Sequence, residues 1–120
     1  MPRVILIVED DPATLVGFAT YLHGVGLSVI PVSTFTEAHR IMQFARPDVL
    51  VADVRLGEYN GLQLVVQSRS LDPPPGVIVT SGYADAVLKA EAERLGAKFM
   101  PKPIEPAHLL AEISRLVRPW

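Results

Sequence analysis

The chain has 120 residues, 49% of them apolar, which is the size of one domain with a single buried core. Its formal net charge of −2 leaves no basic stripe for a phosphate backbone, so direct nucleic-acid binding is not expected. No apolar run approaches the roughly 20 residues that cross a bilayer, and the N-terminus lacks a signal-peptide pattern. No cysteine is present to form disulfides, which is typical of a cytoplasmic protein. Together these features predict a cytoplasmic protein without membrane contact, folded as one domain over residues 1–120.

Short apolar runs alternate with longer amphipathic segments along the chain. The runs at 4–8 and 49–52 are apolar throughout and too short for helices, as is typical of central parallel strands, and the second ends abruptly in Asp53. Strands are predicted at residues 4–8, 28–32, 49–52, 77–80 and 98–101.

The segments between these runs carry helix signals. Asp11 is a suitable N-cap, with Pro12 in the first helical position. Thr34 and Glu37 have the spacing of a capping box. The predicted helices start at residues 12, 35, 62, 84 and 105 and end near residues 24, 45, 70, 95 and 117.

Five repeats of strand and helix predict an α/β fold in which a doubly wound, five-stranded parallel sheet is covered by helices on both faces. We expect the strand order 2-1-3-4-5 of a flavodoxin-like sheet. Such a sheet binds its ligand beyond the carboxyl ends of its strands.

Polar residues follow these strand ends and should converge at one edge of the sheet. Three carboxylates in one crevice repel each other unless a positive charge joins them, and Mg²⁺ with oxygen ligands is the usual partner. A lysine and a hydroxyl could then hold a phosphoryl group, which fits phosphoryl transfer to a carboxylate. The residues are Glu9, Asp10, Asp53, Thr80 or Ser81, and Lys102.

Four motifs in order resemble the receiver domains of two-component response regulators, including the chemotaxis regulators. VILIVEDD at 4–11 is similar to the first strand and acidic pair of the family, and VLVADVRLGEYNG at 49–61 to its phosphoacceptor strand. VIVTSG at 77–82 resembles the strand with the switch hydroxyl, and GAKFMPKP at 96–103 the Lys-Pro motif. The resemblance covers the whole chain.

The resemblance implies that Asp53 accepts phosphate from a phosphohistidine on a sensor kinase or phosphotransfer protein. It implies Asp10 as a direct Mg²⁺ ligand, Glu9 as a ligand through water, and the backbone carbonyl of Arg55 as a further ligand. Lys102 would pair with the phosphoryl group, next to a cis Lys102-Pro103 peptide. Apart from its own phosphorylation and dephosphorylation, the domain would catalyse no reaction.

The resemblance also implies a switch. Only one of Thr80 and Ser81 can face the site, because side chains alternate along a strand. A small residue follows the hydroxyl in the family, and Gly82 makes Ser81 the better candidate. Phe99 matches the switch aromatic, which moves inward. The fourth helix, the fifth strand and the last helix would form the face that changes on phosphorylation and contacts an output domain or effector protein.

Two positions depart from the common pattern. Arg55 and Tyr83 stand two residues after Asp53 and Ser81, where the family borders the path of the attacking water. Both side chains are large, which predicts slow hydrolysis of the aspartyl phosphate. Leu56-Gly57 replaces a frequent Met-Pro and removes no functional group.

Other functions fit the residues less well. A nucleotide- or flavin-binding module would need a phosphate cradle after the first strand, where Glu9 and Asp10 would repel the ligand. A phosphatase with an aspartyl nucleophile would need a carboxylate at Arg55. A degenerate receiver that binds proteins without phosphorylation is the stronger alternative. The chain ends at Trp120, just after the last helix, so we expect signalling by protein contact; the kinase, stimulus and output cannot be read from the sequence.

Overall fold

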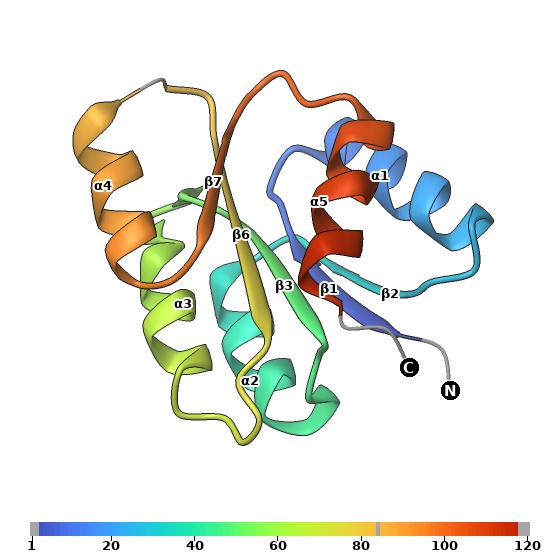
Figure 1. Ribbon diagram of the computed structural model, residues 1–120, viewed down its shortest axis with the longest axis horizontal. Coiled ribbons are helices and arrows are strands. Elements are labelled where there is room, and N and C mark those ends of the chain that lie inside the picture. Colours follow the sequence, from blue (N-terminus) through green and yellow to red (C-terminus); the bar gives the residue numbers. More distant parts are fainter. Residues whose placement is uncertain (1–2, 84, 118–120) are drawn as a thin grey trace.

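The computed structural model describes residues 3–83 and 85–117 and shows a parallel sheet between two layers of helices (Figure 1). The strand order is β2-β1-β3-β6-β7, which is 2-1-3-4-5 when the five strands of this sheet are counted along the chain, as predicted. These strands are β1 (Val4–Val8), β2 (Ser28–Val32), β3 (Val49–Asp53), β6 (Gly76–Ser81) and β7 (Lys98–Pro101).

Helices cover both faces of the sheet. Apolar side chains of α1 and α5 pack on one face around Ile7 and Ile78, and those of α2, α3 and α4 pack on the other around Leu50 and Val79. None of the helices among residues 3–83 and 85–117 is long and apolar enough to cross a membrane. The helices are α1 (Pro12–Gly24), α2 (Phe35–Ala45), α3 (Leu62–Ser68), α4 (Ala86–Arg94) and α5 (Pro106–Leu116).

Side-chain caps fix where three of the helices begin. The predicted caps are confirmed: Asp11 accepts a hydrogen bond from the Thr14 N–H, and Thr34 accepts one from the Glu37 N–H. Asp85 caps α4, which therefore starts at Ala86 instead of the predicted residue 84; residue 84 itself lies outside the described residues. The third helix is shorter than predicted and ends at Ser68.

A small hairpin follows β3, in a segment for which the sequence predicted no strand. It pairs β4 (Arg55–Leu56) with β5 (Tyr59–Asn60) in antiparallel register, and Gly57 takes a positive φ of 63° in the turn. Two-residue strands show no periodicity, which is why the pattern of the sequence did not reveal them. The hairpin lies directly after Asp53, so it belongs to the surroundings of the predicted site.

Candidate functional site

The register of the sheet brings the predicted site residues to one edge. Val8 is paired with Ala52, so Glu9 follows β1 where Asp53 ends β3. Asp53 is in register with Thr80 of β6, and Ser81 is in register with Pro101 of β7. Lys102 follows Pro101, and its backbone N–H donates to the Ser81 carbonyl at 2.7 Å.

Three carboxylates meet at this edge. Glu9, Asp10 and Asp53 each offer an oxygen, and these oxygens lie within 4.8 Å of one another. Glu9 is 2% exposed and Asp53 is 6% exposed, whereas Asp10 is open to solvent. Two carboxylates of the cluster are therefore buried, and the third is accessible to solvent.

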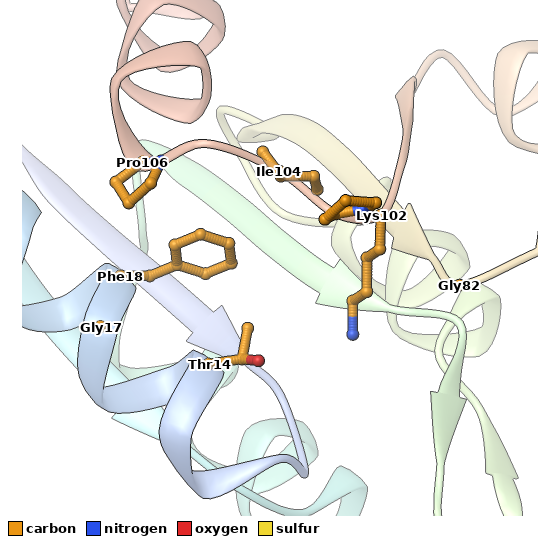
Figure 2. Close-up of a pocket in the computed structure, with 8 residues that line it drawn as sticks. Thr14, Gly17, Phe18, Gly82, Lys102, Ile104 and Pro106 are labelled. Atoms are coloured by element: carbon orange, nitrogen blue, oxygen red, sulfur yellow. The ribbon is translucent and has the colours of Figure 1, made fainter.

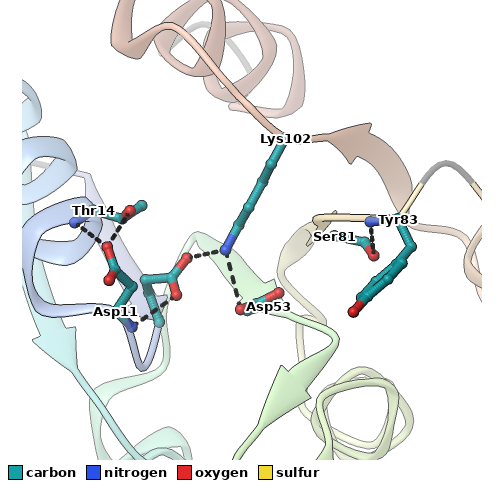
Figure 3. Close-up of polar contacts among 7 residues, drawn as sticks. Asp11, Thr14, Asp53, Ser81, Tyr83 and Lys102 are labelled. Carbon is teal, nitrogen blue, oxygen red and sulfur yellow. Dashed lines mark hydrogen bonds and ion pairs between the residues drawn. The ribbon is translucent and has the colours of Figure 1, made fainter.

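Lys102 binds two of the three carboxylates. Its Nζ donates to Glu9 Oε1 at 2.6 Å and to Asp53 Oδ2 at 3.1 Å, and Figure 3 shows the side chain extending from its loop towards Asp53. The Lys102-Pro103 peptide is cis, as the resemblance implied. The two hydrogen bonds place the ammonium group of Lys102 within the acidic cluster.

Burial and neighbouring charges together shift the pKa values of Glu9 and Lys102. Burial raises the pKa of Glu9, and the hydrogen bonds from Lys102 and from the Asp11 N–H offset only part of that rise. For Lys102, burial lowers the pKa, but hydrogen bonding and attraction from Glu9 and Asp53 outweigh it, so the pKa ends above its usual value. Lys102 therefore stays protonated at neutral pH.

The donor set fits a divalent cation. One ammonium group faces three carboxylates, so the cluster keeps an excess of negative charge, and carboxylate oxygens are the ligands that Mg²⁺ prefers. Glu9, Asp10 and Asp53 are the side chains that could hold it. The role of the Arg55 carbonyl stays a prediction.

Both candidate hydroxyls are buried. The Ser81 Oγ accepts the Tyr83 N–H at 3.1 Å (Figure 3). Val79 packs with Phe99 on the face covered by α2, α3 and α4, so alternation places Ser81 on that face and Thr80 on the other. Ser81 thus shares a face with Phe99, which is 8% exposed and already lies in the core here. The choice of Ser81 as the switch hydroxyl stays a prediction, supported by this geometry.

The two large residues that depart from the family pattern contact each other. The Arg55 guanidinium carbon lies 4.3 Å from the centre of the Tyr83 ring, a cation–π distance. Both residues are exposed, with Tyr83 at 54%. The sequence marked each position separately, but only the structure shows them joined, because one follows β3 and the other follows β6.

An apolar groove beside Lys102 was not predicted. It has a volume of about 460 Å³, and Thr14 and Phe18 of α1 face Lys102 and Ile104 across it (Figure 2). The signal that could have indicated it is the composition of α1, which contains no Asp, Glu, Lys or Arg and is apolar on its exposed side as well, for instance at Val16.

Comparisons with known proteins agree with this geometry. Residues 5–114 match the family model described as the response regulator receiver domain. The chain is 29% identical over 118 residues to the TorCAD operon transcriptional regulatory protein TorR of Escherichia coli K12, covering 98% of this chain and 51% of TorR. It is 32% identical over 106 residues to the alginate biosynthesis transcriptional regulatory protein AlgB of Pseudomonas aeruginosa, covering 88% of this chain and 24% of AlgB.

Solved structures show the same fold. A response regulator receiver domain protein (CheY-like) from Methanospirillum hungatei JF-1 is 26% identical with a TM-score of 0.91, covering 98% of this chain and 94% of that one. The BeF3-activated DrrB receiver domain is 25% identical with a TM-score of 0.86, covering 97% of both chains. The present chain spans about half or less of the two curated relatives, and it belongs to the response regulator receiver domain family.

Proposed function

We propose that this chain is a phosphoacceptor domain of the cytoplasm, in which Asp53 takes a phosphoryl group from a histidine kinase or phosphotransfer protein in a Mg²⁺-dependent reaction. The observation that carries the proposal is the buried Asp53 carboxylate, gathered with Glu9 and Asp10 and bound by Lys102. The domain would catalyse only its own phosphorylation and dephosphorylation.

In the proposed reaction, an Asp53 oxygen attacks the phosphorus of the phosphohistidine. A P–O bond forms as the P–N bond breaks, and the bonding electron pair leaves with the imidazole nitrogen. Lys102 can shift from Asp53 to a phosphoryl oxygen, and the Ser81 hydroxyl can donate a second hydrogen bond. A bound Mg²⁺ would supply further neutralisation of the phosphoryl charge.

The groove beside Lys102 supports a docking site for the phosphate donor. It continues from the Lys102 side chain along Thr14 and Phe18, so a partner seated in it would stand next to the acceptor. Helix α1, which forms one wall, carries no Asp, Glu, Lys or Arg and can be covered without desolvating such a charge.

The proposed output is a change of the face formed by α4, β7 and α5. Ala92 is the only fully buried residue of α4, so few apolar contacts hold this helix on the sheet. If Ser81 rotates to donate its O–H to the phosphoryl group, its Oγ would leave the Tyr83 N–H that it now accepts, and this would free the backbone at Tyr83, ahead of α4. An output domain or effector protein would bind the altered face.

Intact mass spectrometry tests the proposal. Incubation with acetyl phosphate and MgCl₂ should add the mass of one phosphoryl group to the wild type and none to Asp53→Asn. Asp11→Asn is the matched control, because Asp11 adjoins the cluster but caps α1, and asparagine caps equally well. A wild type that gains nothing, as a degenerate receiver would, or an Asp53→Asn variant that gains as much, would refute phosphorylation at Asp53.

Arg55 and Tyr83 are expected to prolong the life of the phosphoryl group. Their stacked pair stands beside the site and should slow the approach of water, so Arg55→Ala and Tyr83→Ala should each shorten the half-life of the aspartyl phosphate. A cation–π contact at an exposed site stabilises by about 0.5–1 kcal/mol, which corresponds to a change of about two- to fivefold. The half-life is measured by following the loss of the phosphorylated protein after the phosphate donor has been removed.

The control for this pair is Arg94→Ala, at an exposed arginine of α4. The double variant should decay no faster than the faster single variant, because either change breaks the same contact. Half-lives equal to that of the wild type in both single variants would contradict the role.

A further inference from the structure

Aromatic stacking anchors the β4–β5 hairpin to α2. The Tyr59 ring lies parallel to Phe35, with 4.6 Å between centroids and 10° between planes. Phe35 in turn stacks on His39 at 6.0 Å and 13°. Gln67 of α3 ties His39 down, with 2.6 Å between its Oε1 and the His39 Nδ1, and its Nε2 donates to the His39 carbonyl at 3.1 Å.

The strand order gives this stack its position relative to the acidic cluster. Strand β1 lies between β2 and β3 and is followed by Glu9 and Asp10. Phe35 belongs to the segment after β2, and Tyr59 belongs to the segment after β3. The Tyr59–Phe35 stack therefore joins the two segments that flank the end of β1.

Backbone hydrogen bonds connect the hairpin to the residue that follows Asp53. Tyr59 pairs with Leu56, and Asn60 pairs with Arg55. At its base, the Gly61 N–H donates to the Val54 carbonyl at 2.6 Å, next to Asp53. A displacement of Tyr59 would therefore move the backbone that carries the acceptor.

We infer that Tyr59 is a positioning residue for the cation site: its stack on Phe35 holds the hairpin so that Asp53 stays in place against Glu9 and Asp10. The inference rests on the cation site of the proposed function. It predicts that losing the stack weakens divalent-cation binding although Tyr59 itself is no ligand. The stabilisation that an aromatic pair provides corresponds to a change of about three- to tenfold in an equilibrium constant. We therefore expect the affinity for the cation to fall by about this factor when the stack is lost.

Isothermal titration calorimetry with Mn²⁺ and with Mg²⁺ measures this effect on the unphosphorylated protein. Tyr59→Ala should raise the dissociation constant three- to tenfold, whereas Tyr59→Phe, which keeps the ring, should bind as the wild type does. Phe35→Leu should act like Tyr59→Ala, and it carries the same test if Tyr59→Ala does not fold. The double variant should bind no more weakly than Tyr59→Ala, because both changes remove one contact.

Phe44→Ala is the matched control, because Phe44 is an aromatic residue of the same helix that is 76% exposed. An unchanged dissociation constant in Tyr59→Ala would overturn the inference. So would an equal loss in Phe44→Ala, or additive losses in the double variant. A wild type that binds no cation would overturn both this inference and the cation site, whereas phosphorylation of Asp53 is judged separately by intact mass.

Discussion

Replacing Gly61 with alanine should lower the free energy of unfolding by about 3 kcal/mol and slow phosphorylation of Asp53 about a hundredfold. A Cβ atom at this position would lie 1.9 Å from the carbonyl oxygen of Asp53 and 3.3 Å from the Cα of Val54. These are backbone atoms, which cannot rotate aside as a side chain can. The acceptor strand or the start of α3 must therefore move.

The cause is space rather than backbone conformation, because Gly61 has φ −59° and ψ −20°, which alanine also adopts readily. Gly17→Ala is the matched control: its new Cβ would meet nothing within 4 Å in α1, so it should be neutral or slightly stabilising. Urea unfolding gives the stability, and acetyl phosphate labelling gives the rate. A Gly61→Ala variant as stable as the wild type, or one that is destabilised but labelled at the normal rate, would contradict this account.

The sheet could be predicted because its signals are local. Apolar runs of four or five residues bounded by turn residues placed all five main strands to within one residue at each end. Caps at Asp11 and Thr34 also placed two helix starts correctly. The start of α4 was wrong because the capping role of Asp85 was missed, and the hairpin was missed because its strands have two residues each.

The acidic cluster could be predicted for a topological reason. The carboxyl ends of parallel neighbours meet at one edge, so Glu9, Asp53 and Lys102 had to approach one another once the strand order was set. Contacts made by the β4–β5 hairpin follow no such rule. The Tyr59–Phe35 stack and the Arg55–Tyr83 contact depend on how the hairpin lies against α2 and against the end of β6, and only coordinates show them.

Gly61 illustrates the same limit. In the sequence it stands beside Asn60 at the end of the VLVADVRLGEYNG motif, where a glycine indicates only a local turn. Its actual constraint is the carbonyl group of Asp53, eight positions earlier, packed against its Cα. Even within one loop, a glycine kept for space cannot be distinguished by sequence from one kept for flexibility.

Lys102→Ala should cost about 2 kcal/mol of stability at neutral pH without added cation, and this cost should shrink as the pH falls. Breaking a buried ion pair usually costs more than this, but the Lys102 side chain is 23% exposed, which moderates the loss. Glu9, which is 2% exposed in the wild type, would face Asp53 in the variant with no ammonium between them. The same change should slow phosphorylation about ten- to a hundredfold, because a charge-assisted hydrogen bond to the phosphoryl group is lost.

The sign of the pH dependence follows from Glu9. Its folded-state pKa is already raised by burial, and removing Lys102 raises it further because a hydrogen bond and an attractive charge disappear. At a pH above the raised pKa of Glu9 in the variant, this carboxyl is ionised and the full loss of stability relative to the wild type is present. As the pH falls through that pKa towards the ordinary value of 4.5, Glu9 takes up a proton, which replaces the missing ammonium group, and the stability difference from the wild type shrinks.

Urea unfolding of wild type and Lys102→Ala from pH 8 down to about pH 4.5 measures the difference, with Lys98→Ala, at an exposed lysine of β7, as the control whose small effect should not vary with pH. Mg²⁺ should narrow the gap at neutral pH, because a bound cation can neutralise the carboxylates that the lysine no longer pairs. A deficit that stays constant or grows on acidification would mean that Lys102 stabilises the fold through packing of its aliphatic stem. In that case the charge balance of Glu9, Asp53 and Lys102 would not govern the stability of the site.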